Sequence, residues 1–167
     1  MDTLKINQVG LDAEKSAEIA QQLDGLLSTF QVFYQNARGF HWNIKGEKFF
    51  ELHLKFEELY TDALLKIDEI AERILTLGYT PSHTFSEYLD KSAINVSKNV
   101  ADGNEAVQHV VEGFQKLLKK ERAILAFSDE LNDEGTNALM GDYIRAQEKL
   151  VWMYSAFLNL KRTQRNN

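Results

Sequence analysis

The 167-residue sequence contains no cysteine and only one proline, Pro81. Without cysteine the chain cannot form a disulfide, an iron–sulfur cluster or a thiolate zinc site, so any bound metal must use nitrogen and oxygen ligands. The scarcity of proline and of β-branched runs favours long helices over strands. The length suits one domain with a sizeable core.

The sequence also lacks an excess of positive charge. Its formal net charge is −6 and its pI is near 5.3, which works against nucleic-acid binding through the general surface and suits a protein that attracts cations. The first ten residues contain no apolar signal-peptide region, and the most apolar stretch, residues 150–158, is too short to span a bilayer. We therefore expect a cytoplasmic protein without a membrane partner.

Hydrophobic spacing and capping residues predict an all-α protein. Asp12, Asp102 and Thr136 are placed to cap three helices, and Thr84 with Glu87 forms a capping-box pattern. The long segment between the second and third long helices favours a four-helix bundle with a crossover connection that carries the short helix. We expect one domain over residues 1–167, with short flexible tails at 1–10 and 162–167. The predicted helices cover approximately residues 12–40, 47–77, 84–91, 103–131 and 136–161.

The second long helix carries two different stripes. With His53 at zero and about 100° per residue, one apolar stripe falls between roughly −120° and −40° and predicts the core-facing side. A second stripe, between roughly 0° and 100°, holds four potential metal ligands that point away from the core. The core stripe comprises Leu52, Phe56, Leu59, Ala63, Ile67, Ile70, Ile74 and Leu77. The ligand stripe comprises His53, Glu57, Asp68 and Glu72.

These four ligands cannot share one metal ion within a single chain. At about 1.5 Å per residue, Glu57 and Asp68 are roughly 16 Å apart along the helix axis. A second copy of the helix, antiparallel across a two-fold axis, would place His53 and Glu57 of one copy opposite Asp68 and Glu72 of the other. The same flank carries further apolar residues, which favours a second helical partner. These residues are Tyr60, Leu64, Ala71 and Leu75.

Simpler interpretations of these residues stay open. Acidic residues spaced i, i+4 are common on solvated helix faces, and a lone histidine such as His53 is more often a surface residue than a ligand. His41, in the segment FHWNIKG, can reach His53 across a tight connection, or it can be a capping or core histidine. Trp42 is most simply a large buried anchor. His83 and His109 stand apart from this group.

Two histidines and three carboxylates suit iron(II), manganese or zinc. A carboxylate-rich site is suited to the oxidation of iron and the retention of iron(III). The sequence contains no Glu-x-x-His pair, from which the usual di-iron site inside a four-helix bundle is built. A di-iron centre inside the bundle is therefore not expected.

The sequence resembles the Dps family, the miniature ferritins known as DNA-binding proteins from starved cells, over about residues 10–160. The resemblance is carried by FHWNIKG at 40–46, FFELHLKFEELY at 49–60 and DEIAERILTLG at 68–78, with DEGTNAL at 133–139 and WMYSAFL at 152–158. It implies a ferritin-like bundle that assembles through two-fold dimers into a hollow dodecamer. Such cages oxidise iron(II), preferably with hydrogen peroxide, store an iron(III) mineral and protect against oxidative damage.

The resemblance also implies residue roles. The ferroxidase centre would take His41, His53 and Glu57 from one subunit and Asp68 and Glu72 from its two-fold mate. Trp42 would lie beside that centre and take part in electron transfer.

Iron entry would follow acidic three-fold pores lined by Asp129, Asp133 and Glu134. This chain has Ala138 where some relatives carry another acid. The alternative for these three acids is an ordinary solvated turn between helices.

Two rival functions stay open. One is a nucleoid-associated protein that compacts DNA, with the metal site incidental; the basic residues Lys161, Arg162 and Arg165 would supply the phosphate contacts. The alternative for those residues is a solubilising helix terminus, and the first ten residues contain only one lysine. The other rival is a purely structural helical dimer without a metal.

Overall fold

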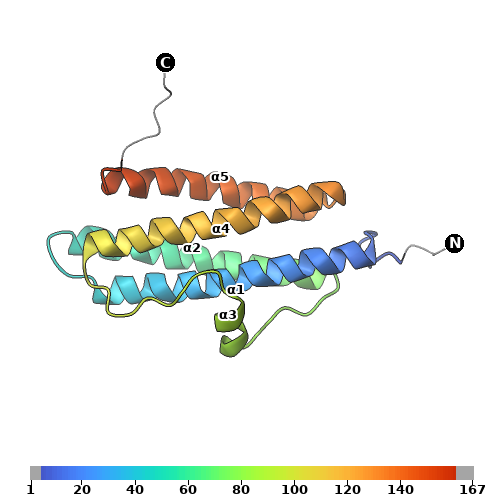
Figure 1. Cartoon of the computed structure of the whole chain (residues 1–167), viewed down its shortest axis with the longest axis horizontal. Helices are drawn as coiled ribbons and strands as arrows, with labels where there is room; N and C mark the ends of the chain where they lie inside the picture. The colour runs from blue at the N-terminus through green and yellow to red at the C-terminus, as the bar shows by residue number, and fades with distance from the viewer. Residues whose placement is uncertain (1–4, 161–167) are drawn as a thin grey trace, which may run out of the picture.

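A computed structural model describes residues 5–160 as a bundle of four long helices and one short helix. In Figure 1, α1 and α2 lie side by side, α4 pairs with α5, and α3 lies on the side of α1 away from α5. Within the described residues the only β contact is an isolated bridge between Ile6 and Asp12. The predicted all-α fold, with a short helix in the crossover connection, is confirmed. The helices are α1 (Ala13–Asn43), α2 (Phe49–Thr76), α3 (Phe85–Lys91), α4 (Gly103–Glu130) and α5 (Glu134–Phe157).

Every helix except α2 begins at a side chain that accepts a hydrogen bond from a free backbone N–H group. Asp12 caps α1, Asp102 caps α4, and Thr84 forms the complete capping box of α3. The predicted cap Thr136 is wrong. Asp133 caps α5 instead and accepts a 3.0 Å bond from the backbone N–H of Thr136. A carboxylate three residues earlier takes the capping position, and α5 ends at Phe157 rather than near residue 161.

The core forms where α1, α2, α4 and α5 face one another. All eight residues of the predicted core stripe on α2 are buried. The ring of Phe56 on α2 packs 5.7 Å from that of Phe40 on α1, and Phe33 on α1 packs 4.9 Å from Phe114 on α4. Burial of each such side chain contributes about 1.5–3 kcal/mol to folding. Because the core stripe occupies one side of α2, the opposite side of this helix is left for other contacts.

The crossover connection between α2 and α4 runs back along α1. The amide of Asn36 donates to the carbonyl of Asn95 at 2.9 Å and accepts from the backbone N–H of Ser97 at 2.9 Å. The hydroxyl of Thr29 accepts from the backbone N–H of Ala93 at 3.1 Å. These side chains replace the backbone partners that an irregular segment lacks.

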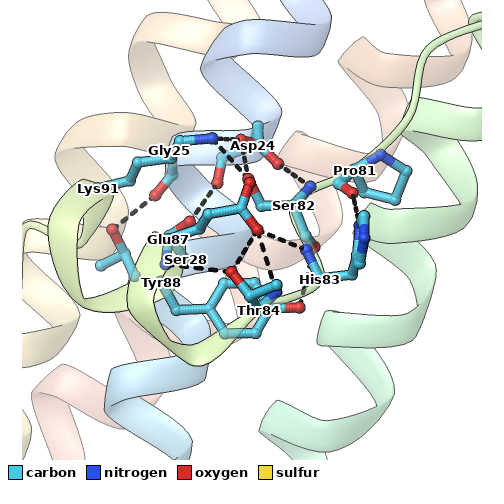
Figure 2. A network of polar contacts seen from close by, with 11 residues as sticks. Asp24, Gly25, Ser28, Pro81, Ser82, His83, Thr84, Glu87, Tyr88 and Lys91 are labelled. Carbon is cyan, nitrogen blue, oxygen red and sulfur yellow. Dashed lines mark hydrogen bonds and ion pairs between the residues drawn. The ribbon is translucent and has the colours of Figure 1, made fainter.

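A polar network around Asp24 attaches α3 to α1 (Figure 2). The Asp24 carboxylate accepts hydrogen bonds of 2.7 Å from the backbone N–H and the hydroxyl of Ser82 and from the ammonium group of Lys91. The Tyr88 hydroxyl donates to the Ser82 carbonyl at 2.9 Å. Burial opposes ionisation of Asp24, but the bonds from Lys91 and Ser82 outweigh it and hold the pKa of that carboxyl below its usual value.

The ends of the chain fall partly outside the described residues. Of the predicted tails, residues 1–4 and 162–167 lie outside them, as do Lys161, Arg162 and Arg165. Within residues 5–10, the Asn7 amide donates to the Ser16 hydroxyl at 3.1 Å and to the Leu77 carbonyl at 3.3 Å. No helix in residues 5–160 is long and apolar enough to cross a bilayer.

Candidate metal centre

The turn between α1 and α2 brings His41 and His53 into contact. His41 lies in the last turn of α1 and His53 in the second turn of α2, so an antiparallel hairpin places them side by side. Gly46 permits the tight connection because its φ of 102° is unfavourable for other residues. The two imidazole rings are stacked with centroids 3.7 Å apart and planes inclined by 16°.

Reciprocal hydrogen bonds fix the orientation of this histidine pair (His41 and His53). The Nδ1 atom of His41 lies 2.7 Å from the backbone carbonyl oxygen of His53, and Nδ1 of His53 lies 2.8 Å from the carbonyl oxygen of His41. A carbonyl only accepts, so in the neutral imidazole each Nδ1 carries the proton and each Nε2 keeps a lone pair. A backbone carbonyl commonly orients a metal-binding histidine in this way. The pair is thus prepared to donate two nitrogens to a cation.

Two aromatic rings enclose the histidine pair. Phe49 stacks on His53 with ring centroids 5.0 Å apart, and Tyr60 makes an edge-to-face contact with His41 with centroids 5.3 Å apart. Helical spacing alone puts Tyr60 on this flank of α2, but it does not show that either ring contacts the histidines. The spacing could have suggested the contact, because Phe49 is four residues before His53 and Tyr60 is seven after it.

Trp42 is not the buried anchor that its size suggested. Its side chain is 57% exposed, and the guanidinium of Arg38 lies over its ring, 4.8 Å from the centroid. The same guanidinium lies 5.2 Å from the Tyr34 ring centroid. Trp42 directly follows His41 near the end of α1, about 200° around the helix from Phe40, so it lies on the side opposite the buried core residues Phe40 and Ile44.

The carboxylates of the ligand stripe do not join the histidines within one chain. Glu57, Asp68 and Glu72 are all exposed. Nowhere in residues 5–160 do three His, Asp or Glu side chains lie close enough together to hold a metal ion. One chain therefore supplies a prepared pair of nitrogens and a separate set of solvent-facing carboxylates.

Exposed apolar side chains accompany these carboxylates along α2. Leu64 is 50% exposed and Leu75 53% exposed, and both lie on the flank of α2 that carries Glu57 and Asp68. Tyr60 and Ala71 on the same flank are half-buried. A helix flank that mixes large exposed leucines with carboxylates is better suited to a partner surface than to water.

The C-terminal part of α2, which carries Asp68 and Glu72, is anchored by Arg73. Its guanidinium binds the buried Asp133 carboxylate at 2.6 Å and the Thr136 hydroxyl at 3.0 Å. A Cβ atom at Gly135 would lie only 2.7 Å from that guanidinium, so a larger residue there would force Arg73 to shift from its present position. Arg73 thereby joins the end of α2 to the start of α5.

The three acids expected at a pore have different environments. Asp133 is 2% exposed and its carboxylate is occupied by Arg73 and Thr136, whereas Asp129 and Glu134 are exposed. The pore assignment stays a prediction, and in it only the two exposed acids could meet an entering cation without breaking existing bonds.

His83 and His109 have their own neighbours away from the centre. His83 is exposed, with Nδ1 3.0 Å from the Pro81 carbonyl oxygen, and His109 stacks on Phe40 at 5.9 Å.

Comparison with known proteins places the chain in a wider group. The family described as a ferritin-like domain matches residues 14–163. An uncharacterized protein of Haemophilus influenzae is 53% identical over 148 residues, which are 89% of this chain and 92% of the relative. The DNA protection during starvation protein of Porphyromonas gingivalis is 44% identical over 148 residues, again 89% of this chain and 93% of the relative.

Solved structures give the same result. The Dps protein of Vibrio cholerae O1 superimposes with a TM-score of 0.91 at 53% identity, covering 95% of this chain and 99% of the other. That protein is described as a member of a broad superfamily of ferritin-like diiron-carboxylate proteins. The fold is therefore shared with such proteins over nearly the whole chain.

Proposed function

The chain belongs to the Dps family of ferritin-like proteins, and from this premise we propose that it is a ferroxidase and iron-storage protein. It oxidises iron(II), with hydrogen peroxide as the preferred oxidant, and holds the iron(III) product as a mineral. In doing so it removes the two reagents that generate hydroxyl radicals, which protects the cell against oxidative damage.

The observation that carries this proposal is the histidine pair. Both Nδ1 atoms are hydrogen-bonded to backbone carbonyls, which leaves both Nε2 atoms to bind a cation. They lie beside a helix flank rich in carboxylates. In the proposed centre His41, His53 and Glu57 of one protomer meet Asp68 and Glu72 of its two-fold mate. This ligand set suits iron(II), and also manganese or zinc as alternative occupants.

The chemistry needs two iron(II) ions for each peroxide. Each ion gives up one electron, the O–O bond breaks, and two protons complete two water molecules. The carboxylates stabilise the higher charge of iron(III), since hard oxygen anions favour the more highly charged ion. Trp42 follows His41 in the chain and is exposed, and in this proposal it would take part in electron transfer.

The proposed centre requires an assembly. A two-fold dimer would complete two equivalent centres and would cover Leu64 and Leu75. Twelve chains arranged in such dimers would enclose a cavity for the mineral, with Asp129 and Glu134 near the entry route for iron. Native mass measurement tests this directly, and a particle of a single chain would contradict it.

The function is tested by replacing both Asp68 and Glu72 with alanine. Loss of two anionic ligands should slow peroxide-dependent iron(II) oxidation by about 100-fold or more, because outer-sphere changes alone commonly cost 10–100-fold. The matched control replaces Glu51 and Glu58, two exposed carboxylates on another side of α2. Equal oxidation rates in the double variant and the wild type would contradict the assignment.

Protection of DNA, which the name of the Porphyromonas gingivalis relative describes, would follow from this chemistry without contact with DNA. Direct coating is the second candidate. The formal charge of −6 per chain opposes it. A gel-shift assay at low and moderate salt, with and without residues 161–167, separates the two.

A further inference from the structure

The interior of the bundle contains a carboxyl group that the proposed iron chemistry does not use. Glu121 on α4 and Gln147 on α5 are both fully buried. The Gln147 amide donates a hydrogen bond through Nε2 to Oε1 of Glu121. Burial of an ionised carboxylate between helices is costly unless it is paired with a charge or fully hydrogen-bonded.

The remaining oxygen of each side chain has no hydrogen-bond partner among the described residues. These atoms are Oε2 of Glu121 and Oε1 of Gln147. If Glu121 were ionised, both atoms could only accept, and both would stay unsatisfied. A single proton on Glu121 Oε2 changes this, because the acid can then donate to the amide oxygen. One proton thus satisfies both groups.

We propose that Glu121 is a neutral carboxylic acid near neutral pH and joins the Gln147 amide in a ring of two hydrogen bonds that links α4 to α5. In this acid–amide ring (Glu121 and Gln147), the amide N–H donates to the acid carbonyl and the acid O–H donates to the amide carbonyl. The ring is a proton-binding site inside the bundle, and it is independent of the proposed iron centre.

The cations near Glu121 are already paired. Lys66 on α2 binds Asp62 at 2.5 Å, and Arg122 on α4 binds Glu148 at 2.7 Å. Neither is therefore a dedicated partner for an ionised Glu121.

The other titratable groups that face Glu121 do not supply a partner for an ionised carboxylate either. On α5 the Tyr143 hydroxyl donates to Glu69 of α2 at 2.6 Å, and the Tyr143 ring lies 5.2 Å from the Lys66 ammonium. Burial raises the pKa of Glu121 to about 7, although the Gln147 bond and the charges of Lys66 and Arg122 act in the opposite direction.

The acid–amide ring gives bundle stability a definite pH response. The folded protein keeps the Glu121 proton up to about pH 7, whereas the unfolded chain loses it near the ordinary value of 4.5. The contribution is therefore complete below about 4.5 and is lost as the pH rises through 7. Over that window the folding constant of each chain falls by up to about ten-fold per pH unit from this group.

Replacing Glu121 with glutamine tests the ring, because a second amide can form the same two hydrogen bonds at every pH. Denaturant unfolding of the assembled wild type and of E121Q is compared from pH 4.5 to 8. We expect nearly equal midpoints at pH 4.5, with E121Q increasingly the more stable up to about pH 7 and a constant difference above it. The opposite trend would overturn the proposal. If the stability of E121Q minus that of the wild type falls between pH 4.5 and pH 7, glutamine is replacing an ionised group.

Infrared spectroscopy of the wild type tests the same proton without relying on the folding of a variant. At pH 6 the folded protein should show the carbonyl stretch of one protonated, buried carboxyl group per chain. Isotope labelling of glutamate assigns the band to that residue type, and raising the pH to 9 should remove it. Absence of a protonated glutamate band at pH 6 would overturn the proposal.

Discussion

The two ends of the ligand stripe on α2 are prepared in different ways. At the N-terminal end, the histidine pair is fixed by reciprocal carbonyl bonds and two flanking aromatic rings. At the C-terminal end, the carboxylate pair (Asp68 and Glu72) is exposed. At this end the ion pair between Arg73 and Asp133 anchors the helix backbone, but it does not fix the ligand side chains.

This difference indicates how the chain divides the formation of a metal centre between folding and assembly. Imidazoles orient well only when a second partner fixes the ring, and that partner is available within the chain. Carboxylates facing one another at the metal centre would repel until a cation arrives, so leaving Asp68 and Glu72 in water until a second protomer docks avoids a strained monomer. The centre is then complete only in the assembly.

The largest effect should come from weakening the docking surface while keeping all five ligands. Replacing Leu64 and Leu75 with glutamine removes apolar contact worth about 1.5–3 kcal/mol for each leucine buried in the dimer. We expect loss of two-fold dimers in native mass measurement and at least about 100-fold slower iron(II) oxidation.

The matched control replaces the same two leucines with methionine, which keeps the surface apolar. A glutamine variant that is monomeric yet oxidises iron(II) at the wild-type rate would contradict the division between folding and assembly.

The next largest effect should come from removing the contact between Arg73 and Asp133, which anchors the carboxylate end of α2. Replacing Asp133 with alanine removes the partner of the half-buried Arg73 and the cap of α5, and we expect the free energy of unfolding to fall by about 3 kcal/mol. Asp129, exposed four residues earlier, serves as the control, with a change within about 0.5 kcal/mol. Denaturant unfolding measures both variants. If the free energy of unfolding falls by the same amount in both, the Arg73 contact does not contribute to stability.

A smaller effect should come from the rings beside the histidine pair. Replacing Phe49 with leucine removes the ring stacked on His53, and we expect about ten-fold weaker cobalt(II) binding, read from the visible spectrum of the bound ion. Replacing Tyr60 with phenylalanine keeps the edge contact with His41 and should leave binding unchanged. Unaltered cobalt(II) affinity in F49L would show that the carbonyl bonds alone orient the pair.

The smallest effect should concern α3, which lies outside the centre. The pKa of Asp24 is lowered in the folded state, so its contribution is present above the ordinary value of 3.8 and is lost as the pH falls below it. Acid should therefore lower the hydrogen-exchange protection of residues 85–91, measured relative to the intrinsic exchange rate at each pH, before it lowers that of α2. Replacing Asp24 with asparagine should remove most of this pH response, and an unchanged response would identify another group.

Much of this organisation could be predicted from local patterns. The caps at Asp12, Asp102 and Thr84 and the buried stripe of α2 were predicted correctly because each depends on residues within one or two helical turns. Thr136 was wrong because Asp133 also fits the capping position, and its buried pairing with Arg73, sixty positions earlier, cannot be found from spacing alone. The exposure of Trp42 could have been predicted, because helical spacing places it about 200° from the buried Phe40, on the opposite side of α1.

The sequence also contains a signal for the buried pair of Glu121 and Gln147. Glu121 is in register with Phe114, Leu117 and Ile124, which form the buried stripe of α4. A polar residue in such a stripe predicts a buried hydrogen-bonded group, although its partner on α5 could be identified only from the fold.

The central claim, that two protomers complete each centre, is tested most directly by mixing two inactive variants. One lacks His41 and His53, the other lacks Asp68 and Glu72, each through alanine substitutions. In mixed assemblies about a quarter of the centres would combine intact histidines with intact carboxylates, because each half comes from an intact chain about half the time. We therefore expect co-expressed, doubly tagged assemblies to recover about a quarter of wild-type iron(II) oxidation. If these mixed assemblies stay as inactive as either parent, the ligands must come from one chain and the account is wrong.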